Sequence, residues 1–231
     1  SGRSIPKTSN GSGTASGNGD NWNREHSWPK SRGFSSESDE PYTDIHHLRP
    51  TDISINTARD NLSYDESDRA LFESEITSES DPTLRAQVLA QTAQNYKDDD
   101  SFEPRAEVKG DVARMMLYMD TRYEAGGTYI DLVLTNQLAD NGGTLGKLCT
   151  LLQWNMADPV SEFERNRNDA AYQYQGNRNP FIDSPEWVDI LYPIETCDSV
   201  DGGGDTGGDT GGDTGGDTGG DTGGDTGGDT G

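Results

Sequence analysis

The sequence predicts a single α+β domain, rich in helices, over residues 21–195. Apolar residues recur at helical spacing through its second half, whereas residues 20–50 read as short extended pieces and turns broken by proline and glycine. Roughly 180 residues are ample for one hydrophobic core. Residues 1–20 are poor in apolar groups, so we expect a loop-like segment there.

The C-terminal segment, residues 196–231, is expected to be a disordered linker. From residue 201 onward it repeats Gly-Gly-Asp-Thr and holds no apolar side chain, so nothing offsets the entropy of ordering it. Nonapeptide repeats that bind calcium also combine Gly with Asp, but they carry an apolar residue in every turn. The composition therefore indicates a flexible, charged linker, and we expect further domains beyond it.

Two helices are expected in the middle of the chain. Residues 51–64 read as a short helix that Thr51 would cap, with Asn56 and Arg59 one turn apart on one face. Residues 101–123 read as a longer helix whose apolar stripe is typical of a core. The stripe consists of Val108, Val112, Met115, Met116, Met119 and Tyr123.

Three further helices are expected towards the C-terminal end. Residues 144–154 carry an apolar face of four leucines at helical spacing. Residues 157–175 and 184–192 each begin with a polar capping residue followed by proline, which is a typical helix start. These pairs are Asp158 with Pro159 and Ser184 with Pro185.

The chain is strongly acidic, with a formal net charge of −24. Eight of its aspartates lie in the C-terminal repeat, so the remainder carries −16. Affinity for nucleic acid comes largely from Lys and Arg side chains that release counterions from phosphates. The balance argues against tight passive binding of nucleic acid, but it allows an enzyme that contacts phosphates at one local site.

The two cysteines, Cys149 and Cys197, permit one disulfide, and two buried thiols are an equal alternative. No stretch of the sequence approaches the roughly 20 apolar residues of a membrane-spanning helix. We therefore expect no membrane span in this chain.

A carboxylate and an imidazole stand side by side at Glu25 and His26, and Asn56 follows in the next expected helix. Carboxylate and amide oxygens suit a hard cation such as Mg²⁺, which keeps several waters and is often held by one or two protein groups. An imidazole beside the ion can take the proton of an attacking water, because it titrates near neutrality. The alternative without function is that Glu25 and His26 are two surface residues and that Asn56 is a cap or turn residue.

Five segments of the chain occur in an order and with a composition that resemble one family. They are NREHSWPKSRGF, DIHHLRPTDISINTARDN, FEPRAEVKGDVARMMLYMDTRY, LLQWNMADPVSEFERNRND and QGNRNPFIDSPE. Together they resemble the bacterial endonuclease I family, from about residue 20 to about residue 192. Members of that family are periplasmic or secreted non-specific nucleases with a ββα-metal (His-Me finger) active site. The resemblance implies that His26 is the general base and that Glu25 and Asn56 hold one ion, Mg²⁺ or else Mn²⁺ or Ca²⁺.

Other site residues follow from their positions near this motif. Arg59, one turn beyond Asn56, is expected to assist catalysis by clamping a phosphate. Asp44, His46 and His47 are expected to orient the metal ligands without binding the ion themselves. A purely structural role is the alternative for either histidine. Five residues are expected to contact the substrate: Arg24, Lys30, Gln175, Asn177 and Arg178.

The last three of these have an alternative role, because they could instead satisfy the amides of their own loop. Arg114 and Arg122 flank the apolar stripe of the longer helix and are expected to form surface salt bridges.

The resemblance implies a secreted endonuclease, with a periplasmic location as the second choice, that hydrolyses DNA and also RNA to 5′-phosphorylated fragments. The alternative is a non-catalytic surface or adhesion module tethered by the Gly-Asp linker. Glu25, His26 and Asn56 distinguish the two hypotheses, because an adhesion module without catalytic activity has no need to retain them.

Overall fold

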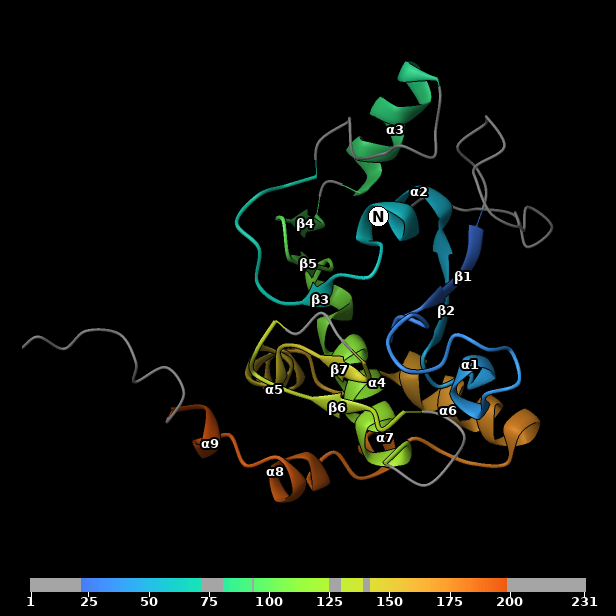
Figure 1. Ribbon diagram of the computed structural model, residues 1–231, viewed down its shortest axis with the longest axis vertical. Coiled ribbons are helices and arrows are strands. Elements are labelled where there is room, and N and C mark those ends of the chain that lie inside the picture. Colours follow the sequence, from blue (N-terminus) through green and yellow to red (C-terminus); the bar gives the residue numbers. More distant parts are fainter. Residues whose placement is uncertain (1–21, 72–80, 93, 125–129, 139–141, 199–231) are drawn as a thin grey trace, which may run out of the picture.

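The computed structural model describes residues 22–71, 81–92, 94–124, 130–138 and 142–198 (Figure 1). The expected segment 1–20 and the repeat from residue 201 lie outside the described residues. The helices are α1 (Glu40–Thr43), α2 (Ile53–Arg59), α3 (Pro82–Thr92), α4 (Lys109–Arg122), α5 (Leu148–Ala157), α6 (Glu162–Gln175), α7 (Pro180–Asp183), α8 (Trp187–Leu191) and α9 (Glu195–Asp198). The strands are β1 (Trp22–His26), β2 (Leu48–Asp52), β3 (Ser63–Tyr64), β4 (Tyr96–Lys97), β5 (Ser101–Glu103), β6 (Val133–Leu134) and β7 (Thr144–Leu145). This mixture of helices and short strands confirms the α+β class.

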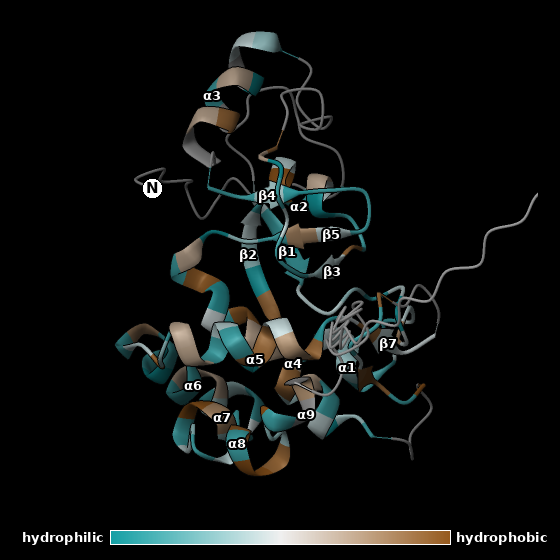
Figure 2. Cartoon of the chain, turned by 90° about the vertical axis from the view of Figure 1, so that its left-hand side faces the viewer, coloured by the Kyte–Doolittle hydropathy of each residue, from teal (hydrophilic) through white to brown (hydrophobic). Residues whose placement is uncertain are grey.

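Helix α4 forms the centre of the core and packs against α5 and α7 (Figure 2). The predicted apolar stripe is buried from Val112 to Tyr123. Every residue from 110 to 119 is buried, including those on the opposite side of the helix. Helix α4 is therefore surrounded by protein, whereas a stripe alone predicts burial on one side.

The helix expected from residue 101 begins at Lys109 instead. Ser101–Glu103 form strand β5, because Pro104 disfavours helical backbone at the residue before it and supplies no amide hydrogen. A short 3₁₀ turn over Ala106–Val108 then leads into α4.

Strands β1 and β2 pair antiparallel, and helix α2 follows β2 directly. The register places Glu25 opposite Arg49 and His26 opposite Leu48. Since residues opposite each other in such a ladder point to the same face of the sheet, Glu25 and Arg49 are neighbours on one face.

The cap expected at Thr51 is wrong. Thr51 still pairs with Asn23 in the ladder, and Asp52 caps α2 by accepting the Ser54 amide at 2.8 Å. The partner strand that keeps Thr51 extended lies far away in the sequence, so local pattern does not reveal it.

Helix α6 begins at Glu162 and is capped by Ser161, so the expected cap at Asp158 is also wrong. Ser161 and Glu164 form a reciprocal capping box. Asp158 ends α5 instead, and its side chain accepts the Gly110 amide at 2.9 Å.

The expected start at Ser184 is displaced in the same way. Ser184 ends helix α7, and α8 begins at Trp187 after Glu186, which makes no side-chain capping bond. The helix expected over residues 144–154 also begins later than expected. Leu145 lies in strand β7, and α5 begins only at Leu148.

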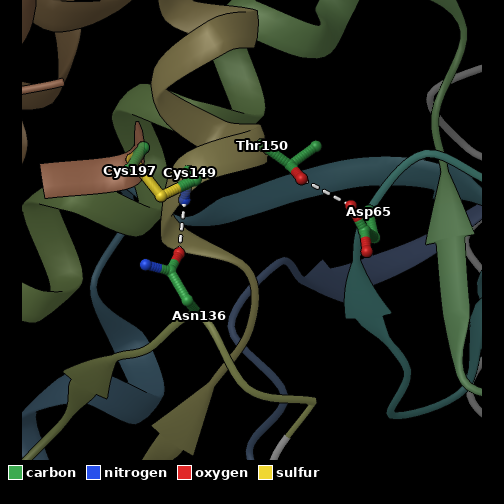
Figure 3. The surroundings of a disulfide bond; sticks show 5 residues. All are labelled: Asp65, Asn136, Cys149, Thr150 and Cys197. Carbon is green, nitrogen blue, oxygen red and sulfur yellow. Dashed lines mark hydrogen bonds between the residues drawn. A yellow bond between two sulfur atoms is a disulfide. The ribbon is translucent and has the colours of Figure 1, made fainter. Parts of the chain in front are cut away.

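Cys149 of α5 and Cys197 of α9 form a disulfide, with their Cα atoms 5.6 Å apart (Figure 3). The Cys149 amide also donates to Asn136 Oδ1 at 2.8 Å. The bond ties α9 to the core, and the domain boundary expected at residue 195 falls within this helix.

The remaining strands form two small sheets, one in the order β3-β5-β4 and one of β6 with β7. Among the described residues, no helix combines the length and apolarity that crossing a membrane requires.

Candidate active site

Glu25 lies near the end of β1 and is buried against Arg59 of α2. Arg59 Nη1 donates to Glu25 Oε1 at 2.8 Å. Burial raises the pKa of Glu25 to about 7, although the Arg59 charge acts in the opposite direction. No donor in the described part of the chain bonds Glu25 Oε2, so this oxygen is available to a ligand.

Arg59 is only 3% exposed, and its Nε is buried without a partner in the described part of the chain, so its hydrogen bonds come from the two terminal nitrogens. Besides Glu25, they donate to the carbonyls of His26 at 3.1 Å and Ser27 at 2.7 Å, while the guanidinium lies 4.7 Å from the Tyr64 ring centroid. The phosphate contact expected from sequence stays a prediction, since these bonds leave Nε and one hydrogen of Nη2 without an acceptor among the described residues. The geometry favours Arg59 as the group that orients Glu25.

The imidazole of His26 is half-buried beside helix α1. Its Nε2 lies 2.9 Å from the carbonyl oxygen of Tyr42. A carbonyl only accepts, so Nε2 carries the hydrogen and Nδ1 of the neutral ring is unprotonated. Burial lowers the pKa of His26, and the Tyr42 bond opposes that shift while Lys30 and Arg24 add to it. The ring is therefore set up to accept a proton at Nδ1.

Asn56 projects from α2 with its amide group held by β1. Its Nδ2 donates to Asn23 Oδ1 at 2.7 Å and to the Arg24 carbonyl at 3.4 Å. Oδ1 of Asn56 accepts no hydrogen bond within the described ranges. The amide is thus oriented with its oxygen left for another partner.

The donor set fits a Mg²⁺-type ion. Glu25 and Asn56 line the same cleft and each offers one oxygen without a protein donor. An ion of this kind keeps several waters and needs few protein ligands. The described residues contain no cluster of three or more His, Cys, Asp or Glu that would cage a metal.

Asp44 is a buried polar centre on the segment between α1 and β2. Its Oδ2 accepts the hydroxyls of Tyr118 and Tyr123 at 2.7 and 2.6 Å, and its Oδ1 accepts Gln175 Nε2 and the His46 amide, both at 2.8 Å. Burial alone would raise the pKa of Asp44, but the bonds from Gln175, Tyr123 and Tyr118 lower it overall. Asp44 therefore holds this segment as an anion.

His46 and His47 support the same segment and face different neighbours. His47 Nε2 donates to the Pro41 carbonyl at 2.7 Å, and its ring centroid lies 5.5 Å from that of His26. Burial lowers the pKa of His47 to about 4. His46 Nε2 lies 3.2 Å from the Asn177 carbonyl, and its ring centroid lies 4.7 Å from that of Tyr118. Of the two, His47 touches the candidate base.

The polar side chains at the end of α6 and in the loop that follows it bond to other parts of the protein. Gln175 bridges Asp44 and the Ile45 amide, and Asn177 Nδ2 donates to the Tyr118 hydroxyl at 2.7 Å. Arg178 is paired with two carboxylates, those of Asp183 and Asp169. None of the three lines the cleft, and these bonds run to other segments and to carboxylates, not to the loop's own amides, so their contact with substrate stays a prediction.

Arg24 and Lys30 are exposed on either side of His26. Lys30 Nζ lies 5.7 Å from the ring centroid of Tyr42, whose carbonyl accepts the His26 bond. Both cations lower the pKa of His26, which places their positive charge near the imidazole. They are positioned to attract a phosphate to it.

A cleft of about 940 Å³ lies between the β1–β2–α2 unit and the first turns of α4 and α6. Glu25, Asn56 and Arg59 line the first side. The second side carries residues that the sequence did not single out: Asp111, Phe163 and Arg167, with Arg49 reaching across from β2. Arg167 Nη2 donates to the Leu48 carbonyl at 2.7 Å, which fastens α6 to β2.

The sequence contains a local signal for only some of the residues on this second side of the cleft. Phe163 and Arg167 are four residues apart on a predicted helix and so share a face. Nothing local places that face against β2. Arg49 becomes recognisable only once the ladder puts it opposite Glu25.

Arg114, expected at the surface, is 1% exposed. It donates to both carboxylate oxygens of Glu164, at 2.7 and 2.8 Å. The surface reading is wrong because Glu164, Asn155 and the Asp158 carbonyl enclose the guanidinium. Arg122 does form an exposed pair, with its Nη2 4.0 Å from Glu40 Oε2.

Comparison with known proteins adds a family match and two curated relatives. The family model described as Endonuclease I matches residues 3–186. An extracellular ribonuclease of Bacillus subtilis (strain 168) is 45% identical over 179 residues, which cover 77% of this chain and 56% of that protein. An extracellular ribonuclease of Bacillus amyloliquefaciens is 47% identical over 174 residues, covering 74% of this chain and 54% of that protein. The chain thus spans about half the length of the curated relatives it matches.

Proposed function

Because the chain belongs to the endonuclease I family, we propose that it is a secreted nuclease that hydrolyses phosphodiester bonds with a divalent ion held by Glu25 and Asn56. His26 is the general base. The observation that carries this assignment is the bond from His26 Nε2 to the Tyr42 carbonyl, which leaves Nδ1 without a proton in the neutral ring.

The proton transfer is the task of His26. Nδ1 accepts a proton from the water that attacks the phosphorus, and the bond to the 3′ oxygen breaks, so the product strand begins with a 5′ phosphate. His47 packs against His26, and Tyr42 fixes the ring by its carbonyl. A base held in this way contributes roughly 10²- to 10⁴-fold to the rate.

Glu25 and Asn56 would hold the ion, with Arg59 keeping the Glu25 carboxylate in place. When bound, a Mg²⁺-type ion stabilises negative charge that develops on the phosphate and on the leaving oxygen. Mn²⁺ and Ca²⁺ are the alternatives for the same oxygen donors. Arg24 and Lys30, exposed beside His26, supply positive charge for the phosphate next to the scissile bond.

Substrate and location rest on the relatives. Both are named extracellular ribonucleases, which supports RNA as a substrate and secretion of this chain. We include DNA because nothing in the described cleft demands a 2′ hydroxyl. An adhesion module finds no support among the relatives.

The test is hydrolysis of plasmid DNA and of a labelled RNA with Mg²⁺ and with chelator. The wild type should cut both with Mg²⁺ and neither with chelator. His26→Ala should lose roughly 10²- to 10⁴-fold in turnover while keeping its circular dichroism spectrum, and added imidazole should restore part of the rate. A His26→Ala protein with near-normal turnover contradicts the assignment of the base.

A further inference from the structure

Phe163 is an exposed aromatic residue in the cleft. It lies in the first turn of α6 with 63% of its surface exposed, whereas the next residue, Glu164, is 3% exposed. The carboxylate points inward to Arg114, and the apolar ring points outward into a cleft lined with charged groups. An exposed aromatic side chain inside a binding cleft is available to a ligand.

One face of the Phe163 ring is already covered. The Arg49 guanidinium carbon lies over it, 5.4 Å from the centroid, and Arg49 is in turn held by an ion pair with Asp111. The ring is therefore backed by a cation that α4 keeps in place. Because Phe163 is 63% exposed and lines the cleft, its ring keeps surface that Arg49 does not cover.

The same arginine links the ring to the candidate catalytic residues. Arg49 stands opposite Glu25 in the β1–β2 ladder and on the same face of it. Arg49 consequently connects Phe163, on the second side of the cleft, to Glu25, on the first. Arg105 and Arg167 line the cleft as well, together with the carboxylates of Glu107 and Asp111, so charged groups of both signs lie near the ring.

We propose that Phe163 is a base-stacking subsite, in which an unpaired nucleobase packs on the open ring face while Arg49 supports the other face. This rests on the proposed nuclease function and adds to it a preference for nucleic acid with unpaired bases. Bases in a duplex are stacked on each other and paired, so they offer no face to a side-chain ring unless they are flipped out. Unpaired bases stack on aromatic residues regardless of their identity.

The experiment measures binding without hydrolysis, by fluorescence anisotropy in the presence of chelator. Three labelled ligands are compared: a short oligothymidylate, a strand of equal length made only of abasic sugar phosphates, and the corresponding duplex. The variants are Phe163→Ala, Phe163→Leu and Phe163→Trp. Tyr174→Ala is the matched control, because Tyr174 lies on the same helix, is 88% exposed and does not line the cleft.

The wild type should bind oligothymidylate more tightly than the abasic strand. Phe163→Ala and Phe163→Leu should lose roughly fivefold or more in affinity for oligothymidylate alone, the scale of one base–aromatic stack. Phe163→Trp should retain the preference, and Tyr174→Ala should match the wild type on all three ligands.

Two results would overturn the subsite: an equal loss for all three ligands, or a Phe163→Leu variant with wild-type preference. Because no bond is cut in this experiment, its outcome is independent of whether His26 proves to be the catalytic base.

Discussion

Two buried arginine–glutamate pairs, Arg59–Glu25 and Arg114–Glu164, have the same chemistry and opposite surroundings. Arg114 grips Glu164 with two hydrogen bonds, and Ser161 donates to the same carboxylate from its amide and hydroxyl. Although burial acts to raise it, the pKa of Glu164 is lowered overall by Arg114 and Ser161. Every oxygen of this pair is satisfied within the protein.

The Arg59–Glu25 pair is incomplete by comparison. Arg59 gives one bond to Glu25 and two to backbone carbonyls, and its Nε has no partner among the described residues. The pKa of Glu25 is raised to about 7. This pair borders the cleft, whereas Arg114–Glu164 does not. The comparison teaches that a saturated ion pair holds helices together, while an under-satisfied one of the same composition retains capacity for a ligand.

The largest effect is expected from Glu164→Gln. Both carboxylate oxygens face donors, so the amide NH₂ of glutamine would meet an N–H in either orientation. Breaking a buried pair in this way costs about 3–5 kcal/mol of unfolding free energy, measured by urea denaturation. Glu40→Gln is the control, because its pair with Arg122 is exposed and should change stability by less than about 1 kcal/mol. A Glu164→Gln protein as stable as this control contradicts the structural role.

Asp44→Asn extends the comparison to a third buried carboxylate, whose hydrogen-bond donors are all neutral. The variant should lose about 1–3 kcal/mol near neutral pH, because its amide meets donors that the carboxylate had accepted.

The pH dependence follows from the lowered pKa of Asp44. Its stabilising contribution is fully present above the unfolded value of about 3.9 and is lost as pH falls through the folded pKa. The difference between wild type and variant should shrink below about pH 4. A difference that stays constant in acid would show that the carboxylate's charge is not what matters.

The smallest stability effect is expected from Glu25→Gln. Its amide oxygen can still accept from Arg59, its NH₂ can take the place of Oε2, which meets no described donor, and Arg59 keeps two carbonyl partners. The free energy of unfolding should change by less than about 1 kcal/mol, within the range of an ordinary polar substitution. The apparent Mg²⁺ affinity in hydrolysis should fall at least about tenfold, as when groups around a metal are lost. If stability drops as far as in Glu164→Gln, the contrast between the two pairs fails.

Local pattern was sufficient for much of the helical content, whereas the roles of the motif residues were inferred from the family resemblance. The burial of the apolar stripe of α4 follows from its helical spacing, although the burial of the opposite side does not. Glu25, His26 and Asn56 were singled out through the resemblance to the endonuclease I family, because their chemistry alone left a surface pair and a cap as the alternative. The roles of these three stay predictions until the variants are measured. The helix starts at Asp52 and Ser161 were missed, because strand pairing and competing caps act there.

What the sequence by itself determined is therefore local: which segments favour helix, that the Gly-Gly-Asp-Thr repeat has nothing to bury, and which side chains could hold an ion or accept a proton. Only the tertiary structure decided the disulfide between Cys149 and Cys197, the burial of Arg114, and the wall of Arg49 and Phe163 beside Glu25. The physical reason is distance along the chain. Backbone propensity is set by neighbouring residues, whereas burial, pairing and the shape of a cleft depend on segments that meet only after the chain has folded.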